Sequence, residues 1–98
     1  MAEIVARRGQ TFKVGLLNPR DGLTDEDVRA SFASVALQTQ AGDDAGGPYP
    51  AVYNAVVQGW VALCPPRSEA VGTILTTIES VTVGGIVYES RGTLRVTA

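Results

Sequence analysis

Residues with reactive side chains are few in this 98-residue chain. It has no histidine, so the commonest general base is missing and histidine-dependent serine or cysteine triads are excluded. A Ser/Lys dyad would have to use Lys13, which lies between Phe12 and Val14 and is interpreted as a solvated strand lysine. Cys64 precedes two prolines, and arginines are the only residues able to lower its pKa, so we interpret it as a half-buried structural thiol. The sequence therefore predicts a protein without catalytic machinery.

The carboxylates favour neither catalysis nor metal binding. Several of them fall in loop-like segments, where solvated side chains are the simplest interpretation: Asp21, Asp25, Glu26, Asp27, Asp43 and Asp44. No Asp-x-Asp-x-Asp-Gly ladder with a distal Glu is present, and calcium needs six to eight oxygen ligands. A single cysteine excludes an internal disulfide and a zinc-thiolate cluster. We therefore expect no cofactor and no metal.

Composition and charge bound the possible partners. Hydrophobic residues make up 45% of the chain and charged residues 18%, which is typical of one packed domain over residues 1–98. The net charge is −2 and the basic residues are scattered, so we expect no nucleic-acid partner. No apolar run approaches the ~20 residues that span a bilayer, and the N-terminus carries no secretory signal pattern. We expect no membrane partner.

The C-terminal third carries the clearest strand signals. Residues 71–83 are rich in β-branched side chains and lead into Gly84 and Gly85, followed by a second β-branched run. Two glycines between such arms predict a hairpin with a type I′ turn, because both central positions of that turn need positive φ. In that register Val83 faces Ile86. Residues 93–97 read as a closing strand, with Gly92 as a bulge or short turn.

The middle of the chain divides at two segments rich in glycine and proline. Residues 12–17 read as a strand, and residues 18–22, with an Asp-Gly pair, as a turn that reverses the chain. Residues 41–50 read as one long loop, the segment we expect to contact a partner. Residues 52–64 alternate with period two and predict a single long strand, broken or bulged at Gly59 and ended by the following prolines.

Residues 24–40 are compatible with two structures. Thr24 with Asp27 three residues later resembles a capping box, and Val28, Phe32 and Val35 have helical spacing. Apolar and polar residues also alternate between Val28 and residue 33, as in a strand. We expect a strand, with a helix near residues 24–38 as the alternative.

Three aromatic residues could form a sugar-stacking platform: Tyr49, Tyr53 and Trp60. Tyr53 and Trp60 are seven positions apart, so on an unbroken strand they point to opposite faces. We interpret one as a core anchor and the other as a surface residue.

Several segments read in order resemble the immunoglobulin-like domain at the N-terminus of phage baseplate upper proteins, and similar domains of tail and fibre proteins. These segments are residues 8–12 (Arg-Gly-Gln-Thr-Phe), Leu16-Leu17, the Asp21-Gly22 pair, residues 28–32 (Val-Arg-Ala-Ser-Phe) and residues 85–96. The resemblance spans most of the chain. It implies a virion building block assembled in the host cytoplasm.

The expected fold is all-β, an antiparallel immunoglobulin-like β-sandwich of about seven strands, with α+β as the alternative. The expected function is a non-enzymatic accessory protein that binds other virion structural proteins of capsid, tail or baseplate in many copies, as a homo-oligomer in the assembly. The alternative is a carbohydrate-binding module for host-surface recognition, carried by Trp60 and Tyr49. The expected contact residues are Arg7, Arg8, Tyr49, Pro50, Trp60, Pro65 and Pro66.

Overall fold

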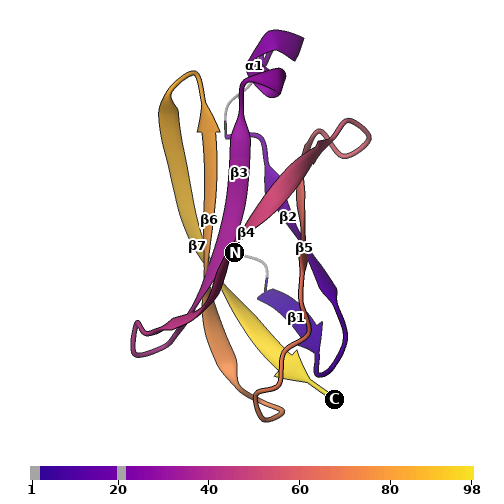
Figure 1. Cartoon of the computed structure of the whole chain (residues 1–98), viewed down its shortest axis with the longest axis vertical. Helices are drawn as coiled ribbons and strands as arrows, with labels where there is room; N and C mark the ends of the chain where they lie inside the picture. Colours follow the sequence, from indigo (N-terminus) through magenta and orange to yellow (C-terminus); the bar gives the residue numbers. More distant parts are fainter. Residues whose placement is uncertain (1–2, 20–21) are drawn as a thin grey trace.

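A computed structural model describes residues 3–19 and 22–98 of the chain. The described residues form seven strands and one short helix (Figure 1). Their bounds are β1 Glu3–Arg7, β2 Phe12–Leu17, α1 Asp25–Arg29, β3 Phe32–Thr39, β4 Asp44–Asn54, β5 Gly59–Cys64, β6 Ile74–Val83 and β7 Ile86–Thr97. The expected mostly β class and the number of strands are confirmed, and the α+β alternative is wrong because α1 spans five residues.

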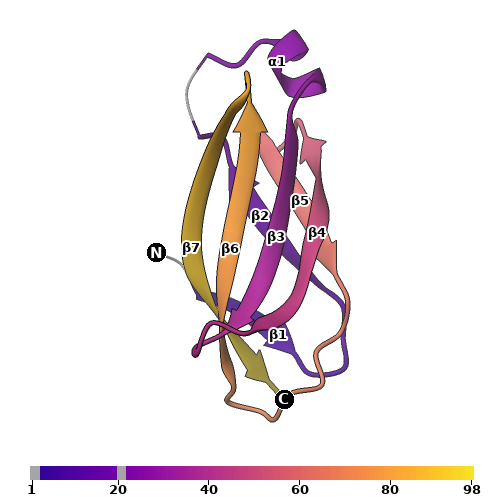
Figure 2. The same cartoon turned by 60° about the vertical axis from the view of Figure 1, so that its left-hand side comes forward.

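The seven described strands form one curled sheet in the order β1-β7-β6-β3-β4-β5-β2. Neighbouring strands are antiparallel except β1 and β7, which run parallel. Strand β4 pairs with β3 along its first part and with β5 along its last part, so it carries the sheet around the core. The two end strands, β1 and β2, contact each other, and the sheet nearly closes into a barrel (Figure 2).

The core lies inside this curled sheet and follows the strand alternation. In β2 every second side chain is buried, as a strand with one face on the core requires. The largest fully buried side chains come from five strands: Val14, Val35, Leu37, Trp60, Leu75, Val83, Leu94 and Val96. Lys13 is exposed on the opposite face of β2, as predicted for a solvated strand lysine.

The hairpin predicted at Gly84 and Gly85 is confirmed. Both glycines have positive φ, 59° and 77°, and Val83 pairs with Ile86 as expected. Gly92 is neither a turn nor a bulge, contrary to expectation, because β7 runs through it and Gly92 pairs in register with Thr77. The chain therefore ends in one long strand whose partner β6 is equally continuous.

The strand expected over residues 24–40 forms only from Phe32 onward, and residues 25–29 form the short helix α1 instead. Thr24 caps α1, since its Oγ1 accepts a hydrogen bond from the Asp27 backbone N–H and the Asp27 carboxylate accepts one from the Thr24 N–H. Helix α1 buries no residue, and β3 begins at Phe32. The predicted Asp21-Gly22 turn falls partly outside the described residues.

The loop predicted at residues 41–50 is wrong in most of its length. The connection after β3 is a short turn, and β4 begins at Asp44. Gly46 and Gly47 lie within β4 with φ of 142° and 83°, and the β3–β4 register shifts beside them. Glycines inside a strand are typical of such irregularities. The Gly-rich segment therefore stays in the sheet as an irregular part of β4 and does not form a loop.

The single strand predicted at residues 52–64 is also wrong, because a turn divides it into β4 and β5. Asn54 starts that turn, where its Oδ1 accepts a hydrogen bond from the Val56 N–H at 2.9 Å, and Gln58 has a φ of 53°. Tyr53 and Trp60 are therefore cross-strand partners on the same face. The predicted end of this segment at the two prolines is confirmed by the end of β5 at Cys64.

Strand β1 was not expected from the sequence. It pairs only with the last residues of β7, from Thr93 to Thr97, so β7 extends well beyond it (Figures 1 and 2). Helix α1 and the β4–β5 and β6–β7 turns lie at one end of the molecule, and the C-terminus lies at the other (Figure 1). Among the described residues no helix is long and apolar enough to cross a membrane.

Candidate functional site

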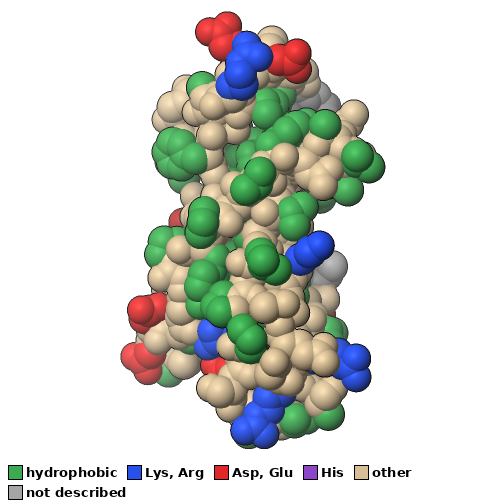
Figure 3. Space-filling model, turned by 45° about the vertical axis from the view of Figure 1, so that its right-hand side comes forward, with side chains coloured by type: hydrophobic (Ala, Val, Ile, Leu, Met, Phe, Trp, Pro, Cys, Tyr) green, Lys and Arg blue, Asp and Glu red, His purple; other side chains and the backbone are tan. Residues whose placement is uncertain are grey.

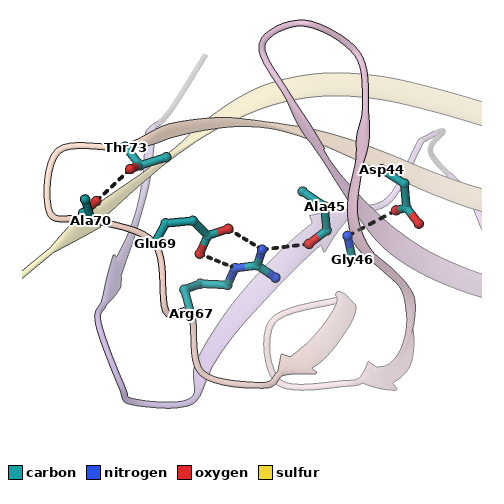
Figure 4. A network of polar contacts seen from close by, with 7 residues as sticks. All are labelled: Asp44, Ala45, Gly46, Arg67, Glu69, Ala70 and Thr73. Atoms are coloured by element: carbon teal, nitrogen blue, oxygen red, sulfur yellow. Dashed lines mark hydrogen bonds and ion pairs between the residues drawn. The ribbon is translucent and has the colours of Figure 1, made fainter.

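A polar network joins the β5–β6 connection to β4 (Figure 4). The Arg67 Nε donates to Glu69 Oε1 at 3.0 Å, and its Nη2 donates to the other carboxylate oxygen and to the Ala45 carbonyl oxygen at 2.6 Å. The Gly9 backbone N–H donates to the Arg67 carbonyl oxygen at 3.0 Å. Arg67 therefore fixes three segments of the chain at one end of the molecule.

The network shifts the titration of its members. The hydrogen bond from Arg67 holds the pKa of the Glu69 carboxyl below its ordinary value, and the same bond raises the pKa of Arg67. The Arg67 side chain is 11% exposed. A guanidinium with so little access to water needs its carboxylate and carbonyl partners, so the network is structural.

Four of the seven predicted contact residues gather at this same end. Arg7 ends β1, and its Nε donates to the Ala98 carbonyl oxygen at 3.3 Å. Arg8 follows it in an exposed turn, and Pro65 and Pro66 are exposed beside that turn after β5. These residues form an exposed corner with two basic side chains.

The other three lie elsewhere. Tyr49 is half-buried in β4 close to Arg67, and Pro50 is exposed next to it. Trp60 is 2% exposed, with its ring centroid 5.3 Å from that of Tyr53 in an edge-to-face arrangement. Trp60 is therefore a core anchor, with Tyr53 partly buried against it, and the sugar platform proposed for Trp60 and Tyr49 has no exposed indole face.

Cys64 is more deeply buried than predicted. Cys64 is 0% exposed, and burial raises the pKa of its thiol more than the nearby Arg67 lowers it. A thiol that stays protonated in the core is a poor nucleophile. Cys64 therefore packs as a small apolar residue at the end of β5.

A cleft of about 420 Å³ opens where the sheet fails to close. One wall is the end of β2 with the residues that follow it, and the other is the part of β7 beyond β1, with β6 behind. Its apolar lining includes Ile4, Leu16, Val81 and Tyr88. The cleft therefore lies between two strand edges.

Four residues with polar side chains also line the cleft, namely Asn18, Glu79, Glu89 and Ser90, and Glu89 has Arg91 as its ion-pair partner. Glu79 lies in phase with the buried residues of β6, and its carboxylate accepts a hydrogen bond from Ser90 Oγ at 3.0 Å. No basic side chain in the described part of the chain pairs with Glu79. The Asn18 side-chain oxygen is buried without a hydrogen-bond partner.

A second surface feature is the outer face of β4, β5 and β2. Side chains that point away from the core on these strands include Val52, Leu63 and Leu17, which are 74%, 62% and 83% exposed. Val56 and Val57 extend this surface into the β4–β5 turn. Figure 3 shows hydrophobic side chains spread over this side, with charged side chains mostly toward the two ends of the molecule. We call this surface the β4–β5–β2 outer face.

No cluster of three metal-ligating side chains is found among residues 3–19 and 22–98. Comparison of the chain with protein-family models, curated proteins and solved structures finds no match.

Sequence reasoning missed the cleft and the Arg67 network. A signal for the cleft was present, since Glu79 falls at the buried phase of the alternating run that contains Thr77 and Val81. A carboxylate in that phase indicates either a hidden partner or an opening in the sheet. The partners of Arg67 lie in segments that only the fold brings together, so no local pattern indicates them.

Proposed function

We propose that the chain is an immunoglobulin-like β-sandwich domain that serves as a non-enzymatic accessory protein of a tailed-phage virion. The strand order supports the fold. Strands β7, β6 and β3 are consecutive neighbours, as are β5 and β2, and β4 links these two groups by pairing with β3 and then with β5. A first strand that pairs parallel with the last, at one edge, is compatible with a Greek-key sandwich of this kind.

The observation that carries the assembly role is the β4–β5–β2 outer face. Exposed apolar residues scattered singly are ordinary, whereas a contiguous apolar surface is typical of protein–protein interaction sites. Val52 and Val61 are register partners on β4 and β5, and Gly15 of β2 continues the same row without a side chain. The face is therefore nearly uncharged apart from Lys13, and its strands already have fixed conformations, which lowers the entropy cost of binding.

The non-enzymatic part is supported by the side chains themselves. The chain has no histidine, and the pKa of its single thiol is raised by burial. The phage assignment is supported by the resemblance of residues 8–12, 28–32 and 85–96 to virion immunoglobulin-like domains. In that setting the partners are other virion structural proteins, bound in many copies because capsid, tail and baseplate repeat.

The test is rebinding to virion particles stripped of the protein. Size-exclusion chromatography with light scattering should show saturable rebinding of the wild-type protein in many copies per particle. The double variant Val52→Lys/Leu63→Lys should lose rebinding without a change in melting temperature, because both side chains are exposed. Val71→Lys is the matched control, since Val71 is exposed on the β5–β6 connection away from this face.

Two results would contradict the proposal. One is a wild-type protein that stays a stable monomer and does not bind the particles. The other is a double variant that rebinds like Val71→Lys, because the outer face would then carry no binding energy.

A further inference from the structure

The edges on both sides of the cleft are open to pairing. Among the described strands β2 pairs with β5 alone, and β7 pairs with β1 only from Thr93 onward. The edge of β7 over residues 86–92 therefore has no paired strand, and the outer edge of β2 pairs with no strand, although β2 contacts β1. An exposed edge carries unpaired N–H and C=O groups and is a template for another extended chain.

We propose that the cleft binds an extended polypeptide segment of a partner protein, with apolar side chains on its inward face and one basic side chain directed at Glu79. This inference rests on the proposed function and names the chemistry of the partner. Main-chain pairing with an open edge supplies binding energy, and the side chains that enter the cleft supply specificity.

The choice of a basic side chain follows from the charges in the cleft. Glu79 has Ser90 as its hydrogen-bond donor, and the described part of the chain supplies no cation for it. A strand that covered Glu79 with apolar atoms would desolvate an uncompensated carboxylate, which is costly. A lysine or arginine at that position would donate a charge-assisted hydrogen bond to the Glu79 carboxylate and offset the cost of burying it. Glu79 therefore rejects an all-apolar strand and selects a basic one.

Asn18 supports an occupant that carries hydrogen-bonding groups. Its side-chain oxygen lacks a partner in the described structure, and Asn18 follows the end of β2 in the cleft lining. A backbone N–H of an incoming strand becomes a donor for this buried oxygen when the Asn18 side chain turns toward the cleft. An apolar small molecule would fill the volume without giving either Asn18 or Glu79 a further hydrogen-bond partner.

The partner is a different polypeptide, because the described strands of this chain already occupy places in its own sheet. Strand β1 combines apolar residues with Arg7, but it is already paired with β7, and its withdrawal would expose Ala6, which is fully buried. A second copy could pair with these edges only through its own open edge, and a concentration-dependent dimer would show such pairing.

The test uses the peptide Thr-Val-Thr-Val-Thr-Lys-Thr-Val-Thr, which places three valines and the lysine on one face. The control peptide carries Glu in place of Lys. Each is titrated into ¹⁵N-labelled protein and followed by amide chemical shifts. The expected result is saturable shifts at residues 15–18 and 88–92 with the lysine peptide, and binding weaker by at least roughly tenfold with the glutamate peptide.

The same two peptides are also titrated into two variants of the protein. Glu79→Gln should abolish the preference between the two peptides, whereas Asp43→Asn, which removes an exposed carboxylate on the β3–β4 turn, should retain it. Because the two peptides are also compared on the wild-type protein, the result does not depend on the stability of Glu79→Gln.

Three outcomes would overturn the inference: no saturable binding of the lysine peptide at millimolar concentration, equal affinity for the two peptides, or shifts confined to the β4–β5–β2 outer face. A concentration-dependent dimer that shifts the cleft amides would also overturn it, because the occupant would then be a second copy. Particle rebinding is a separate measurement with variants on a different face. A failure of the peptide-binding inference is therefore distinguishable from a failure of the proposed function.

Discussion

Arg67 and Glu69 show how two residues in a connection hold three segments together. The Arg67 guanidinium reaches the Glu69 carboxylate and the Ala45 carbonyl, and its backbone carbonyl accepts from Gly9. An ion pair with an arginine that is 11% exposed differs from a surface pair, because removing one partner leaves a charge with little access to water.

We expect Glu69→Gln to destabilise the fold by about 1 to 2 kcal/mol at pH 7. The Glu69 pKa is lowered in the folded state, so its stabilising contribution is present above the ordinary glutamate value of about 4.3 and is lost as pH falls through the lowered pKa. Urea unfolding between pH 7 and pH 3 should therefore show the difference between wild type and variant shrinking in acid.

The matched control is Glu89→Gln. Glu89 Oε1 lies 3.9 Å from Arg91 Nη2, and both side chains are more than half exposed. This pair should therefore contribute less than about 0.5 kcal/mol to the free energy of unfolding at any pH. Equal effects of the two substitutions at pH 7 would mean that the Arg67 network is no stronger than a surface pair.

Gly47 and Gly42 separate backbone conformation from steric contact. Both have φ near +90°, at 83° and 93°, but a Cβ on Gly47 would lie 2.7 Å from the Val35 carbonyl oxygen, whereas Gly42 has open space. Gly42→Ala should cost about 1 kcal/mol and Gly47→Ala at least about 2 kcal/mol. Thermal and urea unfolding of both variants measures the difference, and equal costs would contradict the close approach of β4 to β3.

At the scale of elements, the β4–β5 hairpin depends on Trp60. Its side chain is fully buried and packs edge-to-face on Tyr53 of the opposite strand. We expect Trp60→Ala to destabilise the fold by about 3 to 5 kcal/mol, and Trp60→Phe by less. Val56→Ala, at a 93% exposed turn position, should change stability by less than about 0.5 kcal/mol.

Urea unfolding of these three variants measures whether their losses of stability follow this order. Retention of wild-type stability in Trp60→Ala would place the indole at the surface and revive the carbohydrate-binding alternative. With the indole buried, loss of glycan binding in such a variant would report loss of folding.

The Gly84-Gly85 hairpin is the element that the sequence predicted best, whereas the Thr24 cap was part of the alternative to the expected strand. The Gly84-Gly85 turn and the Thr24 cap depend on contacts between residues a few positions apart, so local residue types determine them. The β4–β5 turn was missed because residues 55–58 contain neither glycine nor proline and continue the alternating pattern. Its one local signal is Asn54, whose side chain accepts from its own backbone two residues later.

At the scale of the whole molecule, the sheet is dominated by contacts between distant parts of the chain. The β1–β7 pairing joins Glu3 to Thr93, and β2 pairs with β5 across the intervening helix and two strands. The molecule measures 42 × 26 × 20 Å along its principal axes, elongated along the strands. Closing such long loops must precede most of the stabilising contacts.

We therefore expect folding on a timescale of about milliseconds to seconds, slower than a helical protein of the same length. Stopped-flow refolding followed by the fluorescence of Trp60, the single tryptophan, measures this rate. Complete refolding within the mixing time would contradict it and would indicate that local hairpins dominate the folding barrier.

The sequence by itself determined the β class, the terminal hairpin with its register and the end of β5 at two prolines. Each of these follows from propensity, turn chemistry or a missing backbone donor within a few residues. The tertiary structure alone decided that the Gly-rich segment 44–47 is strand, that β1 pairs with β7, and that the sheet leaves a cleft beside Glu79. The physical reason is that strand pairing joins residues distant in the chain, and a local pattern shows which face a residue takes without showing which strand lies beside it.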